Sequence, residues 1–316
     1  MENSAAGTPA NGTFKVDDAA SYDNVVDDFE LLTNRYTTPI ADKVIGLADL
    51  RPGYKVLDVG CGTGVLTLLA AREVGAQGRV VGFDLSDGML AKANTLARAG
   101  QFAERIEFVK GDAERMQFAD AGFQSVVSLY ALRHFPDPAQ ALREMFRCSV
   151  PGGQTLVAVG SAPPLFSGAF VSAGMRVISD RILGLIGGAP LYATTFLDRL
   201  IERRLGHLDH GEDAAWTHGV NQYSGTVAAL MRQVGFERIR SVWLGHAATL
   251  DSAQAFWTLQ VTLSSYARKR IQAASAQEIE GLRAEFDAIC THHLARGGSM
   301  VYRSGALITT GRRPSA

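Results

Sequence analysis

Several features that mark particular classes of protein are scarce in this sequence of 316 residues. Only three cysteines are present, Cys61, Cys148 and Cys290, too few for a disulfide framework, so we expect a reducing, cytoplasmic compartment. No run of about 20 apolar residues occurs, so we expect no stable membrane insertion. The 31 basic and 32 acidic side chains leave a net charge of −1, which gives no general attraction to nucleic acid.

Hydrophobic residues make up 47% of the chain, enough for a large core and too many for a disordered protein. Residues 1–20 are expected to form a flexible tail, and residues 21–316 a single domain. The parts of that domain are expected to be an N-terminal helical lid at 21–50, the first half of the core at 51–160, a helical cap at 161–220, and the second half of the core at 221–316 with a helical insert at 251–298.

Short β-branched segments alternate with helical patterns along much of the chain. Ser86 is a good N-cap for a helix over 87–99, and Asp137 before Pro138 begins another over 139–147. Two more helices are expected over 252–270 and 275–294. This alternation is typical of an α/β fold with a Rossmann-like, doubly wound, mostly parallel sheet, which we expect to have seven strands. The expected strands are 55–59, 79–83, 106–109, 125–129, 154–159, 239–244 and 301–310.

The first expected strand runs into a glycine-rich turn, Gly60-Cys61-Gly62-Thr63-Gly64, and then into a helix near Val65. Glycines let backbone N–H groups approach a ligand, and a helix N-terminus adds a positive dipole end. The spacing is GxGxG rather than the GxGxxG of nucleotide-dependent dehydrogenases, and Asp58 precedes the first glycine by two residues. Because a carboxylate there would repel a pyrophosphate, the turn favours a cationic ligand, such as a sulfonium or an ammonium.

The later strands also end in polar groups. Asp84 follows the second strand and could accept hydrogen bonds from two ribose hydroxyls, and Asp112 follows the third and could accept from an adenine amino group. The fourth strand runs into the segment 130–135. Open parallel sheets bind ligands across their carboxyl edge, so these loops are expected to line one crevice. Alternatively, either acid alone could be a helix cap or a turn former.

Four motifs occur in the order and spacing of the class I S-adenosylmethionine-dependent methyltransferases, and the chain resembles this family over residues 20–160. The motifs are VLDVGCGTG at 56–64, VVGFDLSDGMLAKA at 80–93, GDAE at 111–114 and VPGG at 150–153. Within the family the chain is most similar to the ubiquinone/menaquinone C-methyltransferase type. Residues 131–134, Ala-Leu-Arg-His, lie where that group has Gly-Leu-Arg-Asn, so His134 replaces an asparagine.

The resemblance implies S-adenosylmethionine as cofactor, with S-adenosylhomocysteine as product, and it assigns roles residue by residue. Asp84 would bind the ribose, and Leu129 and Tyr130 would lie beside the reactive methyl group. Tyr22 and Tyr36, in a helical segment that folds over the site in this family, are candidates to close it. The methionine part and the adenine would be held by Asp58, Gly60, Gly62, Thr63, Gly64, Leu85, Met89, Asp112 and Ala113.

Methyl transfer from a sulfonium needs alignment and exclusion of water, and it needs a base only if the acceptor loses a proton. His134 is the candidate base, because an imidazole pKa of about 6.5 suits proton transfer near neutrality. Arg133 could stabilise a phenolate or enolate oxygen, and Tyr130 is a third catalytic candidate. Each has a structural alternative: His134 as a packing residue, Arg133 as a solvated side chain and Tyr130 as a wall of the site.

The acceptor is expected to be a small apolar or aromatic molecule, such as a quinol, a polyketide or a terpenoid, with C-methylation favoured over O- or N-methylation. This expectation depends on apolar residues of the cap and insert, which could instead bury the cap on the core or form a homodimer interface. These residues are Leu165, Phe166, Phe170, Met175, Ile178, Leu185, Ile186, Phe196, Phe256 and Trp257.

Two other functions remain open at this point: a NAD(P)-dependent dehydrogenase, which GxGxG and Asp58 disfavour, and a member of the same fold that does not methylate. No metal is expected, because the polar stretch at 207–218 fits no standard zinc spacing. Its metal-ligating side chains are His207, His210, Glu212, Asp213 and His218.

Overall fold

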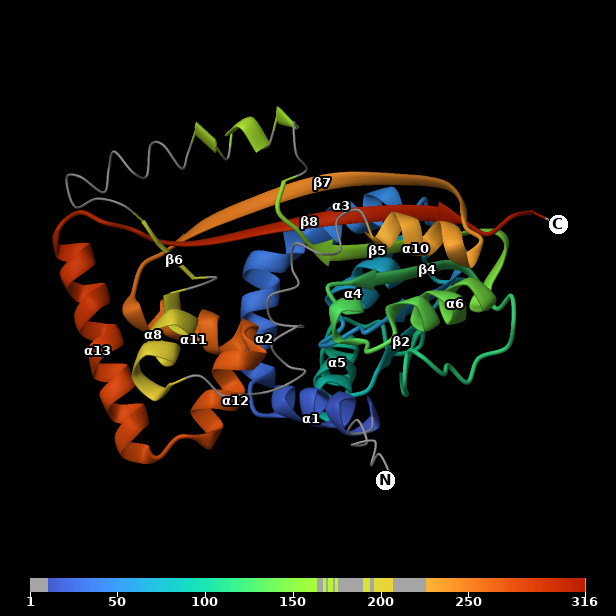
Figure 1. The fold of residues 1–316 in the computed structure, drawn as a ribbon. Helices are drawn as coiled ribbons and strands as arrows, with labels where there is room; N and C mark the ends of the chain where they lie inside the picture. The colour runs from blue at the N-terminus through green and yellow to red at the C-terminus, as the bar shows by residue number, and fades with distance from the viewer. Residues whose placement is uncertain are drawn as a thin grey trace, which may run out of the picture.

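The computed structural model describes residues 11–163, 167–168, 170–172, 174–175, 190–193, 196–206 and 226–315. One twisted sheet crosses the molecule, and a group of helices stands beside it at the left of Figure 1. The strands are β1 (Lys55–Val59), β2 (Arg79–Asp84), β3 (Ile106–Lys110), β4 (Phe123–Leu129), β5 (Ser149–Gly160), β6 (Leu191–Tyr192), β7 (Glu237–Leu250) and β8 (Met300–Arg312).

The sheet has the expected parallel core. Strands β1 to β5 pair in parallel in the order β3-β2-β1-β4-β5, and β8 then pairs antiparallel with β5. β7 pairs antiparallel with β8 along its length. Among the described residues the sheet has eight strands rather than seven, because the two-residue strand β6 adds to β8 in parallel. This order places the carboxyl ends of β1, β2, β3 and β4 at one edge, as the strand pattern predicted.

Helices cover both faces of the sheet. On one face α3 (Thr38–Leu47) and α4 (Val65–Glu73) pack on β1, β2 and β5 in a core that includes Ile40, Leu66 and Leu156. On the other face α6 (Pro138–Cys148) and α10 (Thr226–Val234) bury Leu142 and Met231. Because both faces of the sheet are covered, the central strands need apolar side chains on both sides, which explains their almost continuously apolar sequences.

The predicted helix starts are confirmed at two loops of the carboxyl edge. α5 (Asp87–Ala99) begins after Ser86, whose Oγ accepts a hydrogen bond from the N–H of Met89. α6 begins after Asp137, whose Oδ1 accepts from the N–H of Gln140. Side-chain caps of this kind satisfy N–H groups that have no partner within the helix.

The N-terminal segment differs from the prediction. Residues 11–20 were expected in a flexible tail, but α1 (Asn11–Asp23) is a helix that packs against α5. The prediction of a tail is therefore wrong over this range. It is followed by α2 (Val26–Leu32) and the π-helical turn η1 (Thr33–Thr37), which leads directly into α3. The sequence of α1 is polar, so its packing on the core, rather than its own pattern, holds it in place.

The strands β7 and β8 extend beyond the core sheet and support a second group of helices, which we call the helical lobe. It comprises α8 (Phe196–Leu205), α11 (Ala253–Leu263), α12 (Ser265–Ala273) and α13 (Ala276–Ala295), and it has an apolar core of its own. The expected single helix over 252–270 is wrong: Ser264 ends α11 and its Oγ caps α12 by accepting from the N–H of Ala267. A capping box between Ser275 and Glu278 begins α13.

The aromatic residues that were candidates for an acceptor pocket pack inside this lobe. Phe256 is fully buried, and its ring lies 5.7 Å from that of Phe196 and 5.8 Å from that of Phe286. Trp257 meets Phe286 edge-on at 5.0 Å. These residues therefore pack in the core of the lobe, which agrees with the alternative that they are buried for packing and do not line an acceptor pocket. Phe170 and Met175 are exposed, and the other predicted lining residues, Leu165, Phe166, Ile178, Leu185 and Ile186, lie outside the described residues.

Candidate functional site

The glycine turn after β1 adopts a conformation that its sequence requires. Gly60, Gly62 and Gly64 all have positive φ angles, of 72°, 53° and 86°. A Cβ on Gly60 would also lie 2.2 Å from the Cβ of Ala131, so this glycine is needed for the close approach of the β4 loop as well as for its φ. Cys61 is buried, and burial raises the pKa of its thiol well above the ordinary value, so it is not poised as a nucleophile.

Asp84, at the end of β2, ties two loops of the crevice together. Its Oδ2 accepts from the N–H of Gly62 at 2.8 Å, and its Oδ1 accepts from the N–H of Ser86 at 3.0 Å. Burial raises its pKa, although these backbone N–H groups favour the charged form. The carboxylate therefore connects the glycine turn to the N-terminus of α5.

Asp58 lies beneath the glycine turn with one oxygen unsatisfied. Its side chain is 1% exposed, and its Oδ2 accepts from Thr67 Oγ1 at 2.6 Å. Oδ1 has no hydrogen-bond partner among the described residues, and burial raises the pKa of this carboxyl to about 7. A buried carboxylate oxygen without a partner is costly, so a cation or a water molecule at this point would be stabilised.

The helix α1 lies across the loops that follow β2 and β3. Asp23 Oδ1 accepts from Ser86 Oγ at 2.7 Å and from the N–H of Gly88 at 3.2 Å. Lys15 Nζ forms ion pairs with Asp112 at 2.8 Å and with Glu114 at 2.5 Å. Asp112, predicted to face an adenine, is thus paired with α1 in this structure.

His134 forms the closest polar contact between α1 and the loop after β4. Its Nδ1 lies 2.7 Å from Oδ2 of Asp18 in α1, and its Nε2 accepts from Nε of Arg133 at 3.1 Å. Because Nε2 accepts, the neutral imidazole carries its proton on Nδ1 and donates it to Asp18. In this tautomer Nε2 is unprotonated and its lone pair accepts from Arg133, so Nε2 can act as a base when Arg133 turns away from it.

The charges around this pair shift three pKa values. Burial lowers the pKa of His134, but Tyr22 and Asp18 outweigh burial, so that it lies above the ordinary value. Burial opposes ionisation of Asp18, yet the hydrogen bond with His134 holds the Asp18 pKa below its usual range. Burial acts to raise the pKa of Tyr22. The positive charges of His134, Arg268 and Arg133 act in the opposite direction and outweigh burial, so the pKa falls to about 8. Three ionisable groups with shifted pKa values in one place mark a candidate acid–base site.

Tyr130, the first residue after β4 (Phe123–Leu129), has a backbone conformation that is rare for its type. Its φ is 61°, and a strained residue of this kind at a strand end often marks a functional site. Its hydroxyl lies 3.1 Å from Ser304 Oγ on β8, and burial raises its pKa to about 12. A phenol with that pKa is neutral near pH 7, so Tyr130 can orient a ligand but is a poor base.

The other predicted residues are placed mainly by packing. Thr63, Met89 and Ala113 are buried, at 2%, 3% and 6% exposure, and Leu85 and Leu129 are half-buried. Tyr36 is 3% exposed and meets Tyr302 edge-on at 5.4 Å, in the core of the helical lobe. The structure therefore gives Tyr36 a packing role, whereas Tyr22 meets His134 edge-on at 5.8 Å.

Three residues that the sequence did not single out belong to this site: Lys15, Asp18 and Arg268. Lys15 and Asp18 lie in the segment that was expected to be a tail, and Arg268 lies in the segment 252–270 that was expected to be a single helix. The one signal available was the i, i+4 spacing of Asp18 and Tyr22, which places both on one face of a helix once a helix is known to form.

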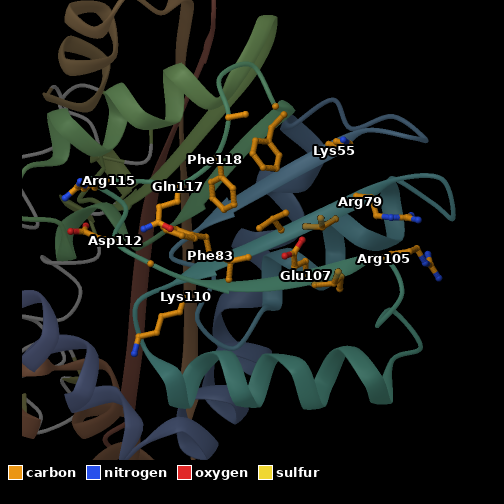
Figure 2. A pocket seen from close by; sticks show the side chains of 18 of the residues that line it. Lys55, Arg79, Phe83, Arg105, Glu107, Lys110, Asp112, Arg115, Gln117 and Phe118 are labelled. Atoms are coloured by element: carbon orange, nitrogen blue, oxygen red, sulfur yellow. The ribbon is translucent and has the colours of Figure 1, made fainter.

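A cavity of about 1020 Å³ lies beside this site, along β2 and β3 (Figure 2). Phe83 and Phe118 form its apolar wall, and Lys110 and Asp112 lie toward one end of it in the figure. It contains neither His134 nor the glycine turn, so it is separate from the acid–base site. Within the described part of the chain, no group of three or more potential metal ligands is found; the stretch 207–218 lies outside that part.

Comparison with known proteins gives a consistent result. Residues 50–172 match a family model described as a methyltransferase domain. A 2-phytyl-1,4-naphtoquinone methyltransferase of Thermosynechococcus vestitus is 46% identical over 36% of this chain and 50% of its own length. A ubiquinone/menaquinone biosynthesis C-methyltransferase of Idiomarina loihiensis is 29% identical over 70% of this chain and 80% of its own length. The chain thus spans about half the length of the first of these curated relatives.

Solved structures show the same fold. The phosphoethanolamine N-methyltransferase 2 of Haemonchus contortus, solved with S-adenosyl-L-methionine, has a TM-score of 0.55 at 16% identity, covering 98% of this chain and 61% of that one. The BH2331 protein of Bacillus halodurans C-125 has a TM-score of 0.51 at 20% identity, covering 87% of this chain and 98% of that one. At these identities the likeness concerns the fold alone.

The parallel core, the GxGxG turn after β1 and the acid at the end of β2 are features that the chain shares with the class I S-adenosylmethionine-dependent methyltransferases, and residues 50–172 match a methyltransferase domain. The core is similar in sequence to demethylmenaquinone and ubiquinone/menaquinone C-methyltransferases, the type that residues 131–134 indicated.

Proposed function

We propose that this protein transfers a methyl group from S-adenosylmethionine to a carbon of a small apolar or aromatic acceptor that carries an ionisable hydroxyl, such as a quinol. The observation that carries this proposal is the Asp18–His134 pair, which leaves Nε2 of a half-buried imidazole unprotonated beside the carboxyl end of β4. The quinone methyltransferases among the relatives support a quinol-like acceptor.

The residues at the carboxyl edge fit the cofactor. The unpartnered Oδ1 of Asp58 would be satisfied by the ammonium of the methionine part, directly or through water. The turn of Gly60, Gly62 and Gly64 would hold the methionine part, and Asp84 would accept from the ribose hydroxyls. When bound, the cofactor supplies a methyl group on a positively charged sulfur, which leaves as a neutral thioether.

The protein's own contribution is alignment and proton removal. Nε2 of His134 takes the proton of the acceptor hydroxyl, which increases the electron density on the neighbouring ring carbon. That carbon would take the methyl group of the bound cofactor; its own proton would then pass to water, and the imidazolium of His134 would return its proton to the acceptor oxygen, which restores the aromatic ring. Asp18 stabilises the imidazolium that forms on His134, and Arg133 can stabilise the oxyanion of the acceptor.

The test is incubation of the protein with methyl-labelled cofactor and a set of lipophilic quinols and phenols. We expect labelled product and S-adenosylhomocysteine in equal amounts, with the methyl group on carbon by NMR, and a loss of about 10²–10⁴-fold in rate for His134→Ala. Label on oxygen or nitrogen would refute C-methylation. Binding of NADH, but not of S-adenosylhomocysteine, in calorimetry would refute the methyltransferase proposal itself.

We further propose that the protein acts in a reducing, cytoplasmic compartment and forms a homodimer through the cap. The buried free thiols of Cys61, Cys148 and Cys290 support the first proposal, and the exposed Phe170 and Met175 support the second. Sedimentation of the wild type and of the Phe170→Ser variant tests the dimer, which the substitution should weaken. No helix within the described ranges is long and apolar enough to cross a lipid bilayer.

A further inference from the structure

Arg268 of α12 is an unusual component of the interior. It is 2% exposed and, within the described residues, is the largest side chain to be fully buried. Arginine is almost never fully buried unless an acid accompanies it. Yet no carboxylate of the described chain lies within ion-pair distance of Arg268, the nearest interactions being hydrogen bonds to neutral groups.

Those hydrogen bonds are too weak to explain why a charge is buried here. Nη2 donates to Ser21 Oγ and Ser265 Oγ, both at 3.3 Å, and Nη1 donates to the carbonyl oxygens of Val261 and Thr262. Nε has no partner among the described residues. A buried charge in such surroundings costs stability that an apolar side chain would not, so a role in packing alone is a poor explanation.

The guanidinium lies instead on the ring of Tyr22. Its Cζ is 4.0 Å from the ring centroid, well within the range of a cation–π interaction, and the same ring forms a T-shaped pair with the His134 ring, with 5.8 Å between the two centroids. The Tyr22 hydroxyl forms no hydrogen bond with any described residue. Tyr22 is therefore held between a guanidinium from α12 and an imidazole from the loop after β4, with its hydroxyl unengaged.

We propose that Arg268 is a positioning residue of the reaction site: it fixes Tyr22 against His134, so that the helical lobe sets the acid–base properties of the pair. The proposal rests on the proposed function, in which His134 removes a proton. A phenolate at Tyr22 would stabilise the imidazolium formed on His134, and the cation on the ring face favours that phenolate.

The charged groups around Tyr22 come from three elements. α12 contributes Arg268, the loop after β4 contributes His134 and Arg133, and α1 contributes Asp18, whose negative charge acts in the opposite direction. Burial alone would raise the pKa of Tyr22, and the three positive groups together bring it down to about 8. Arg268 is the one of these three that the helical lobe supplies.

The experiment follows tyrosinate absorbance during a pH titration of the protein without cofactor. One of the eight tyrosines should ionise near pH 8 in the wild type, and that step should be missing in Tyr22→Phe. In Arg268→Met the step should move up toward the ordinary tyrosine value of 10.0, whereas Arg268→Lys, which keeps the positive charge, should leave most of the shift in place.

Arg270 provides a matched control on the same helix. It is 7% exposed, its Nη2 donates to the carbonyl oxygens of Leu205 and Gly206, and its Nε also has no partner among the described residues. Arg270→Met removes a buried guanidinium from α12 without touching Tyr22, so the tyrosine step near pH 8 should remain. If Arg268→Met unfolds, the comparison of Arg268→Gln with Arg270→Gln carries the test, because only the first removes the positive charge from the Tyr22 ring.

An unchanged titration in Arg268→Met, or an equal change in Arg270→Met, would overturn the proposal. So would persistence of the low step in Tyr22→Phe. Because the titration needs neither cofactor nor acceptor, its result is independent of methyl transfer. The expected titration together with an absence of methyl transfer would overturn the proposed function alone.

Discussion

Asp18 and His134 are 116 positions apart in the chain, and their side chains meet at 2.7 Å between Oδ2 and Nδ1. The contact joins the N-terminal helix to the loop after β4, at the carboxyl edge of the sheet. It also fixes which imidazole nitrogen is protonated, which is the property that a general base requires.

Replacement of Asp18 by asparagine should alter the pH dependence of methyl transfer. Asparagine can still accept the Nδ1 proton, but it removes the negative charge that favours the imidazolium, so the pKa of His134 should fall. Because His134 must be neutral to act as a base, the acidic limb of the rate profile should move to lower pH. Asp17→Asn, at an exposed neighbour, is the control. A profile that does not move would contradict the role assigned to Asp18.

The same pair should contribute to stability within a defined pH window. The lowered pKa of Asp18 stabilises the fold above the ordinary value of 3.8, and this contribution is lost as pH falls through the folded pKa. The raised pKa of His134 stabilises the fold below 6.5, and this contribution is lost as pH rises through the folded pKa. The difference in unfolding free energy between the wild type and Asp18→Asn/His134→Gln should therefore be largest between these values, by urea unfolding at several pH values.

Asp84→Ala should weaken binding of S-adenosylhomocysteine. The variant loses the acceptor of the Gly62 and Ser86 N–H groups and the proposed ribose contacts, and loss of charged hydrogen bonds predicts about 10–100-fold weaker binding in calorimetry. Asp87→Ala is the matched control, because Asp87 is only three residues further on, at the start of α5, but is paired with Lys110 at the surface. Equal effects of the two substitutions would contradict the site assignment.

Gly60→Ala should be more destabilising than Gly53→Ala, although both glycines have positive φ. At Gly53 the added Cβ meets open space, so the cost is that of the backbone conformation, about 1–2 kcal/mol. At Gly60 the Cβ would also lie 2.2 Å from that of Ala131, which should add about 1–3 kcal/mol. Urea unfolding measures the free energy of unfolding of both variants. Similar losses for the two would show that the loop after β4 can move away from the added Cβ.

Phe286→Ala should destabilise the helical lobe without changing the cofactor site. The ring is fully buried among Phe196, Phe256 and Trp257, and the truncation should cost about 3–5 kcal/mol. Leu294→Ala, at an exposed position of the same helix, should cost much less. The affinity of the folded Phe286→Ala protein for S-adenosylhomocysteine should remain that of the wild type. A large loss of affinity would contradict this and show that packing in the lobe core affects cofactor binding.

Features carried by local sequence were predictable. The five parallel strands, the helix caps at Ser86 and Asp137 and the capping box at Ser275 each depend on a few neighbouring residues, so their patterns can be recognised without knowledge of the fold. The positive φ angles of the GxGxG turn follow in the same way from residues 60–64.

Features that depend on distant partners were not predictable. The polar sequence of residues 11–20 gave no sign of a helix, because α1 is held by Lys15 and Asp23 through contacts with the loops after β2 and β3. An apolar aromatic residue such as Phe256 has the same composition whether it lines a pocket or fills a core, and only its neighbours distinguish the two.

The sequence by itself therefore determined the methyltransferase core and its cofactor edge, since strand periodicity, glycine spacing and helix caps are local properties. The tertiary structure decided which groups surround the reacting position. Asp18, His134, Tyr22 and Arg268 come from three separate elements, and the ionisation of the first three depends on charges that only folding brings close to them.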